Sequence, residues 1–165
     1  MTVPGERNEA QLAIIEALKS MPLRLQHEID GLSDAVLRYR TAEGEYSIKE
    51  TIGHLRDHAE VWHKRLSATC SLTDPRWSAF DGDASVRSHA YQEADVDELA
   101  ATIREWRTKT SDLLAHAVDW TRLSQHPERG RRSLRQWAEV VIAHDEEHIA
   151  AIRALKEAQT AARLP

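Results

Sequence analysis

The sequence has few of the residues that cross-link a chain or interrupt its regular elements. Its 165 residues include one cysteine, Cys70, so no disulfide can form within the chain. Glycine occurs 6 times and proline 5 times, which favours long uninterrupted elements. No apolar run approaches the roughly 20 residues that a membrane-spanning helix needs, and the first residues lack the apolar core of a secretion signal. These absences predict a cytoplasmic protein with no membrane partner.

Charged residues are numerous, but the two signs are mixed along the chain. There are 22 Lys and Arg and 27 Asp and Glu, a formal net charge of -5. A nucleic-acid surface needs clustered Lys and Arg, and the nearest cluster, Arg129, Arg131 and Arg132, is typical of a solvated turn. We therefore expect no nucleic-acid partner. The hydrophobic content of 41% suits a globular fold, and we expect residues 1–165 to form one domain.

Four segments have the apolar spacing of amphipathic helices. The first, about residues 6–31, contains Pro22, where we expect a kink or a break with Ser20 capping the second piece. The other three begin at capping residues: Ser47, Asp95 and Ser133. Four apolar stripes are buried most simply in an all-α four-helix bundle.

The connection between the second and third helices, about residues 71–94, is long. A helix of 20 residues is roughly 30 Å long, so this connection can return the chain along the bundle. We therefore expect a long crossover between helices two and three, which then run parallel. Long loops in compact domains are often functional, so the crossover is a candidate roof for a site. Nothing in the loops signals a sheet.

Two histidines of the fourth helix point to a metal. His144 and His148 are one turn apart and continue the apolar stripe of Trp137 and Val141, so they face the bundle interior. Buried imidazoles are costly unless they are hydrogen-bonded or bound to something, and a divalent ion would satisfy both. Glu147 lies off the stripe, which predicts a solvated side chain.

A metal site needs at least one more protein ligand. His54 and His58 are one turn apart on the second helix, and either could face the fourth helix; the residues alone leave both open. Hydrogen-bonded or surface histidines are the ordinary alternative, since an H-x-x-x-H pair is a weak signal by itself. The other five histidines read as surface or loop residues, with His126 placed near the site.

Two segments carry a family resemblance. Glu45–His58 (EYSIKETIGHLRDH) resembles the second-helix signature of the DinB/YfiT-like superfamily of metal-dependent enzymes, and Ala143–Ile149 (AHDEEHI) resembles its fourth-helix signature. The likeness extends from about Ala10 to Leu155. It implies a DinB-like four-helix bundle with one divalent ion, Zn or Ni, with Fe and Mn as alternatives. The implied metal ligands are His54, His144 and His148, with His58 as a neighbour or a further ligand.

The resemblance also suggests a function. Its relatives include thiol-dependent S-transferases, so it implies a metal-dependent transferase that uses a low-molecular-weight thiol as cosubstrate and acts on a small-molecule substrate. The alternatives are a hydrolase in which the metal activates water and a non-catalytic metal-binding or stress-response protein. Because relatives often form dimers, a homodimer is also expected.

Overall fold

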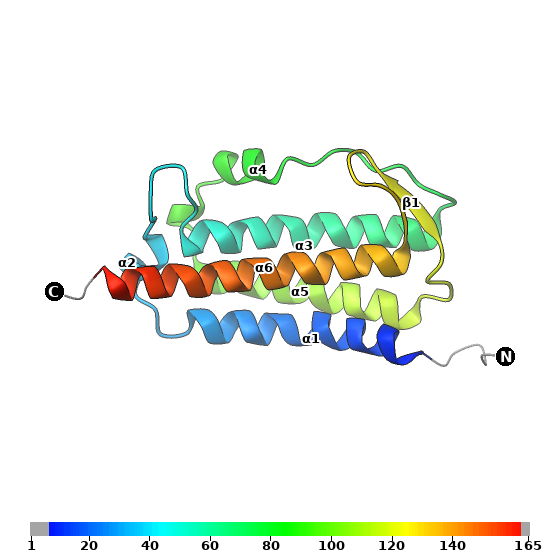
Figure 1. Ribbon diagram of the computed structural model, residues 1–165, viewed down its shortest axis with the longest axis horizontal. Coiled ribbons are helices and arrows are strands. Elements are labelled where there is room, and N and C mark those ends of the chain that lie inside the picture. The colour runs from blue at the N-terminus through cyan, green and yellow to red at the C-terminus, as the bar shows by residue number, and fades with distance from the viewer. Residues whose placement is uncertain (1–6, 163–165) are drawn as a thin grey trace.

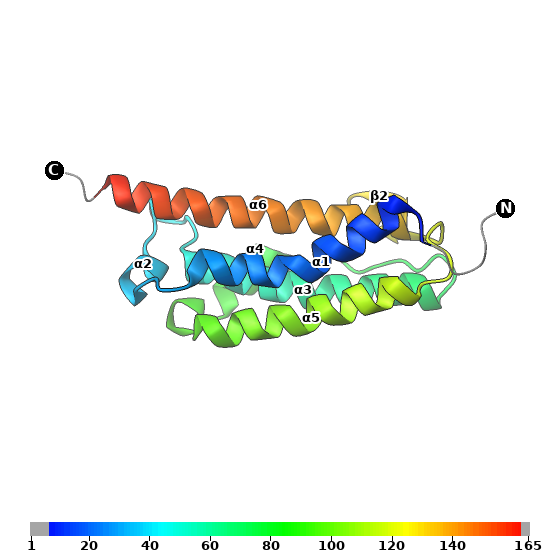
Figure 2. The ribbon, with the colours of Figure 1, turned by 90° about the horizontal axis from the view of Figure 1, so that it is seen from below.

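The structure, a computed structural model, describes residues 7–162, most of which form a bundle of four long helices (Figures 1 and 2). The long helices are α1 (Glu9–Ile29), α3 (Ile48–Ser71), α5 (Val96–His116) and α6 (Leu134–Ala161). The predicted four-helix bundle is therefore confirmed. Among the described residues, no helix is long and apolar enough to span a membrane.

Three of the long helices begin where the sequence predicts. The side chains of the three capping residues each accept a hydrogen bond from a backbone amide in the first helical turn: Ser47, Asp95 and Ser133. Glu50 and Gln136 complete two reciprocal capping boxes by accepting from the cap backbone. Such caps satisfy amide groups that have no partner within the helix, and so fix where it begins.

Helix α1 is continuous through Pro22, so the expected break is wrong. Ser20 does not cap a second piece, because its hydroxyl donates to the carbonyl oxygen of Ala17 at 3.2 Å. The helix persists because its stripe, including the fully buried Leu18, packs against α5 and α6. Figure 2 shows α1 changing direction along its length, which a proline permits by removing a hydrogen bond and crowding the preceding turn.

The crossover between α3 and α5 returns the chain along the bundle, as predicted. Helices α3 and α5 run in one direction, and α1 and α6 run in the other (Figures 1 and 2). The crossover contains two short helices that the sequence did not reveal, α4 (Gly82–Ser88) and η1 (Tyr91–Glu93), both packed on α3. A further short helix, α2 (Asp34–Arg38), lies between α1 and α3.

A short hairpin precedes α6, where no sheet was expected. Strands β1 (Leu123–His126) and β2 (Gly130–Ser133) pair in antiparallel register. The start of the crossover joins β1, because the amide of Trp77 donates to the carbonyl oxygen of Gln125 at 2.9 Å. The strands LSQH and GRRS lack the apolar alternation that signals a strand. The hairpin covers the end of the bundle where α6 begins (Figure 1).

The core of the described residues contains two apolar clusters, and His54, His58, His144 and His148 lie between them along α3 and α6. One cluster, nearer the hairpin, includes Trp62 and Trp137; the other includes Ile52 and Ile149. Along α3 the second cluster comes first, and along α6 the order is reversed, because the helices are antiparallel. The middle turns of both helices therefore meet between the clusters, where polar side chains interrupt the apolar stripes.

Candidate metal centre

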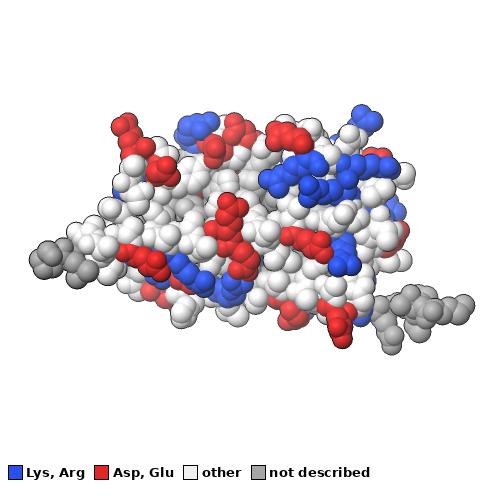
Figure 3. Space-filling view, viewed as in Figure 1, with Lys and Arg blue, Asp and Glu red and all other residues white. Residues whose placement is uncertain are grey.

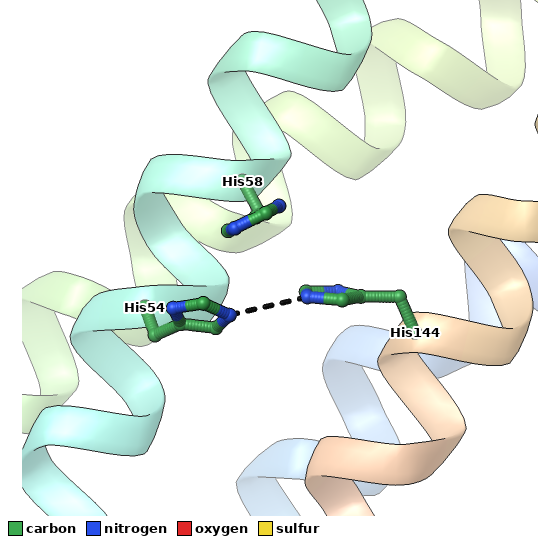
Figure 4. A group of neighbouring side chains, drawn as sticks. All are labelled: His54, His58 and His144. Carbon is green, nitrogen blue, oxygen red and sulfur yellow. Dashed lines mark hydrogen bonds between the residues drawn. The ribbon is translucent and has the colours of Figure 1, made fainter. Parts of the chain in front are cut away.

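Four histidines from two helices meet in this gap. His54 and His58 lie one turn apart on α3, and His144 and His148 lie one turn apart on α6. The two helices pack directly against each other. Figure 4 shows the rings of three of them, His54, His58 and His144, turned toward the space between the helices.

The three histidines predicted as ligands lie together, with the Nε2 atom of His144 close to the Nε2 atoms of the other two. The Nε2 atom of His144 is 3.2 Å from Nε2 of His54 and 3.1 Å from Nε2 of His148. The ring centroids of His54 and His148 are 4.6 Å apart. Since an imidazole nitrogen carries either one hydrogen or one lone pair, the Nε2 atom of His144 cannot bond well to both neighbours.

His58 belongs to the same cluster, although its ring lies differently. It stacks on the ring of His144, with centroids 4.4 Å apart and an interplanar angle of 30°. One nitrogen from each of His54, His58 and His144 lies within 4.8 Å of the others, a grouping compatible with a metal ion. The cluster thus holds four possible ligands, of which His58 and His148 are alternatives for the third position.

Burial keeps these imidazoles uncharged at neutral pH. Together with the nearby imidazoles, burial lowers the pKa of His54 to about 4, of His58 to about 3 and of His144 to about 2; burial is the largest cause in each case. Burial also lowers the pKa of His148. Neutral imidazoles have free lone pairs, which a metal ligand requires.

The donor set fits one divalent ion. In the described part of the chain, the Nδ1 atoms of His54, His58 and His144 are buried without a hydrogen-bond partner, and the Nε2 atoms of His54 and His148 face that of His144. Four ligands about 2.0–2.1 Å from a tetrahedral ion lie about 3.3–3.4 Å apart, close to the observed Nε2 separations. Imidazole nitrogen suits Zn, Ni and Fe rather than Ca or Mg.

Gly82, the first residue of α4, closes the crossover over the rings. A Cβ atom at this position would lie 2.6 Å from Nε2 of His58 and 2.8 Å from Cε1 of His54. Only glycine therefore lets the backbone approach the imidazoles so closely. No sequence pattern signals this role, because the contact joins positions far apart in the chain.

Asp57 ties the crossover to α3 beside the histidines. Its carboxylate accepts hydrogen bonds from Oη of Tyr91 at 2.6 Å, Oγ of Ser85 at 2.7 Å and Nη1 of Arg56 at 3.0 Å. Burial opposes ionisation, but these hydrogen bonds bring the pKa of Asp57 below its ordinary value. A charged, fully bonded Asp57 fixes α4 and η1 over the site.

A buried ion pair holds α6 from the other side. Arg107 of α5 donates from Nε and Nη2 to both oxygens of Asp145, at 2.8 and 2.6 Å. Both side chains are buried, and Asp145 directly follows His144 in the chain. This pair joins α5 to the turn of α6 that carries the histidines, and it was not anticipated from the sequence.

Two cavities meet at the histidine cluster. One, of about 510 Å³, has all four histidines in its lining; the other, of about 630 Å³, lies between the α2–α3 loop and α4. His148 and Asp83 line both. Glu147 lines the first cavity and is exposed, as expected for a solvated side chain.

The remaining histidines lie apart from the cluster, with one exception. His27, His89 and His116 are exposed, and His63 is half-buried on α3. His126, expected near the site, is buried at the end of β1 and lines a cavity of about 90 Å³ together with His58 and His144.

A helical bundle with neutral imidazoles converging from facing helices has the architecture of a metal-binding protein. The sequence profile of the DinB superfamily matches residues 17–152, so the chain belongs to this superfamily. Among solved structures it is similar to YfiT from Bacillus subtilis, described as a probable metal-dependent hydrolase with an unusual four-helix bundle topology. The identity is 20%, the match covers 97% of this chain and 93% of that one, and the TM-score is 0.87. A comparison with curated proteins found no significant match.

Proposed function

We propose that this chain is a metal-dependent thiol S-transferase whose ion, Zn or Ni, is bound by His54, His144 and His148. The closeness of the Nε2 atom of His144 to the Nε2 atoms of His54 and His148 supports this ligand set. His58 packs face to face with His144, so we assign it to the wall of the site. A fourth coordination position is then left for a small molecule, as in catalytic rather than structural metal sites.

The observation that carries thiol transfer is that two cavities meet at His148. A transferase must place two molecules against one reactive centre, and cavities of about 510 and 630 Å³ offer room for a thiol and an acceptor. A divalent ion would hold the thiol in its thiolate form at neutral pH. The sulfur then forms a bond to an electrophilic carbon, and the leaving group takes the released electron pair.

The protein itself offers no competing sulfur nucleophile at this site. Cys70, the one cysteine of the chain, lies near the end of α3 and lines neither cavity. Burial raises the pKa of its thiol, which leaves little thiolate at neutral pH. The nucleophile must therefore be brought by a cosubstrate. A reducing cytoplasm, where such thiols are abundant, is the location we propose.

Hydrolysis is the second candidate, and the carboxylates of the site favour it. Glu128 and Glu147 line the cavity that contains the histidines, so each is placed to accept a proton from a water molecule activated by the ion. The similar protein YfiT is itself described as a probable metal-dependent hydrolase, which points the same way.

Parallel assays on metal-loaded protein separate these functions. Thiol transfer predicts metal-dependent conjugation of low-molecular-weight thiols to haloaromatics or epoxides, abolished in His144→Ala and retained in Cys70→Ser. Hydrolysis of simple esters or amides without any conjugation would replace this proposal with the second candidate. Inactivity in both assays, together with unfolding on chelation, would indicate a structural ion and a non-catalytic protein.

A further inference from the structure

A small cavity beside the histidines is lined by two arginines that have no carboxylate partner among the residues that the structure describes. The cavity holds about 90 Å³, and Arg65 of α3 and Arg129 of the hairpin turn both line it. Within residues 7–162, the guanidinium group of Arg65 makes one hydrogen bond, from Nη2 to the carbonyl oxygen of Ser78 at 2.8 Å. Neither arginine forms an ion pair with any residue in that range.

Arg65 is buried and held in a fixed position. Its exposed fraction is 8%, and its guanidinium carbon lies 5.2 Å from the ring centroid of Trp62 and 5.3 Å from that of Trp77. Burial and the nearby charge of Arg129 lower the pKa of Arg65. Burying a cation without a counter-ion is costly, so an arginine held this way points to an anion from outside the chain.

The hairpin turn that carries Arg129 is also held in place by hydrogen bonds. The buried His126 accepts hydrogen bonds at Nδ1 from the backbone amides of Glu128 and Arg129, at 3.1 and 3.2 Å. These bonds fix the turn against the bundle. Figure 3 shows Lys and Arg side chains gathered on the part of this face where Figure 1 places the hairpin.

The charge balance differs between the small cavity and its larger neighbour. Besides the arginines, Glu128 is the one carboxylate in the lining of the small cavity, which leaves an excess of positive charge. The 510 Å³ cavity has a single arginine against four carboxylates: Asp81, Asp83, Glu128 and Glu147. An anion is therefore favoured in the small cavity and a cation in the large one.

We propose that the small cavity binds a compact anionic group of the substrate, a carboxylate or a phosphate, between Arg65 and Arg129. Its volume, about that of three water molecules in the liquid, accepts a head group and not a whole substrate. The small cavity and the 510 Å³ cavity share five lining residues: His58, Phe80, Glu128, Arg129 and His144. A molecule anchored at the arginines therefore extends its remaining part to the histidine cluster. This assignment of substrate class rests on the proposed function, whereas anion binding can be tested without it.

Titration by nuclear magnetic resonance tests the proposal through the indole N–H signals of Trp62 and Trp77. The probes are acetate and inorganic phosphate, with acetamide as the uncharged counterpart, at constant ionic strength and in both metal-loaded and chelator-treated protein. We expect at least one anion to shift these signals saturably in both forms, and acetamide to leave them unchanged. Which anion binds more tightly identifies the group.

The variants separate the arginines from general charge effects. Arg129→Gln should weaken anion binding by about tenfold, the scale expected for a hydrogen bond to a charged group. Arg131→Gln is the matched control, because Arg131 lies on the same hairpin but pairs with Asp74 at 3.0 Å. The affinity of this control variant for the anion should stay within about twofold of that of wild type. Arg65→Met should abolish binding, and Arg129→Gln decides the outcome if that variant does not fold.

Three results would overturn the proposal: equal binding of acetate and acetamide, unchanged affinity in Arg129→Gln, or loss of anion binding in wild type on chelation alone. The last would mean that the anion binds the ion instead of the arginines. Absence of bound metal with anion binding intact would instead contradict the proposed function and leave this inference standing.

Discussion

The Nε2 atoms of His54 and His144 lie 3.2 Å apart, although the two residues belong to different helices and are separated by 90 positions in the chain. Neither helix could hold this arrangement alone. It depends on the apolar clusters that fix α3 against α6 on both sides, and on the crossover that closes over the rings.

Replacing Gly82 with alanine should weaken metal binding without unfolding the bundle. The new Cβ atom would lie 2.6 Å from Nε2 of His58, so the ring or the crossover must move. We expect a loss of affinity on the order of tenfold, the usual cost of disturbing groups that orient metal ligands. Competition with a chromogenic chelator measures it, and Ser88→Ala, an exposed position on the same short helix, is the control. Unchanged affinity with an unchanged circular dichroism spectrum would show that α4 does not constrain the rings.

Removing one partner of the Arg107–Asp145 pair should destabilise the fold severely. Arg107→Met or Asp145→Asn leaves a buried polar or charged group unpaired, which costs about 3–5 kcal/mol when a buried ion pair is broken. The double variant Arg107→Met/Asp145→Leu should recover most of this loss, because both polar groups are gone. Urea denaturation of chelator-treated protein measures the free energy of unfolding. Single variants that cost less than about 1 kcal/mol would mean that the pair does not hold α6 in place.

Glu28 should make the stability depend on pH in the acid range. Its carboxylate accepts hydrogen bonds from Nζ of Lys156 at 2.9 Å and from Nε of Arg153 at 2.5 Å, which join α1 to α6. These bonds lower the pKa of Glu28 in the folded state, with the bond from Lys156 the largest cause. The stabilisation is therefore complete above the unfolded-state pKa of about 4.3 and is lost as the pH falls through the folded-state pKa.

The matching variant is Glu28→Gln. It should lower the free energy of unfolding by about 1 kcal/mol at pH 7, the scale of a partly exposed ion pair, and the difference from wild type should shrink toward pH 3. Glu16→Gln, at a position 71% exposed, should change little at either pH. A difference that persists undiminished at pH 3 would assign the effect to packing instead of charge.

Local signals made much of this fold predictable. The caps at Ser47, Asp95 and Ser133 place the beginnings of α3, α5 and α6 because they act through amides within one turn. The parallel arrangement of α3 and α5 was predictable because the connection between them is long enough to return the chain along the bundle. The break that was one of the two outcomes expected at Pro22 does not occur, because the local cost of a proline is outweighed by the buried stripe on both sides of it.

The site was predictable only in part, because its geometry is set by contacts between distant positions. The inward direction of His144 and His148 follows from the stripe of α6, and their proximity to His54 is as expected. The roles of Gly82, Asp57 and Arg65 depend on where the crossover and the hairpin pack, which no periodicity encodes. The hairpin itself was missed because its strands are short and polar.

The identity of the metal ligands is the central claim, and elemental analysis of untagged protein tests it most directly. Wild-type protein should carry about one divalent ion per chain. His54→Ala, His144→Ala and His148→Ala should each remove most of that ion while keeping the helical circular dichroism, and His58→Ala should retain it. If His58→Ala removes the ion and His148→Ala keeps it, the ion is bound by His54, His58 and His144, and the proposed site is wrong.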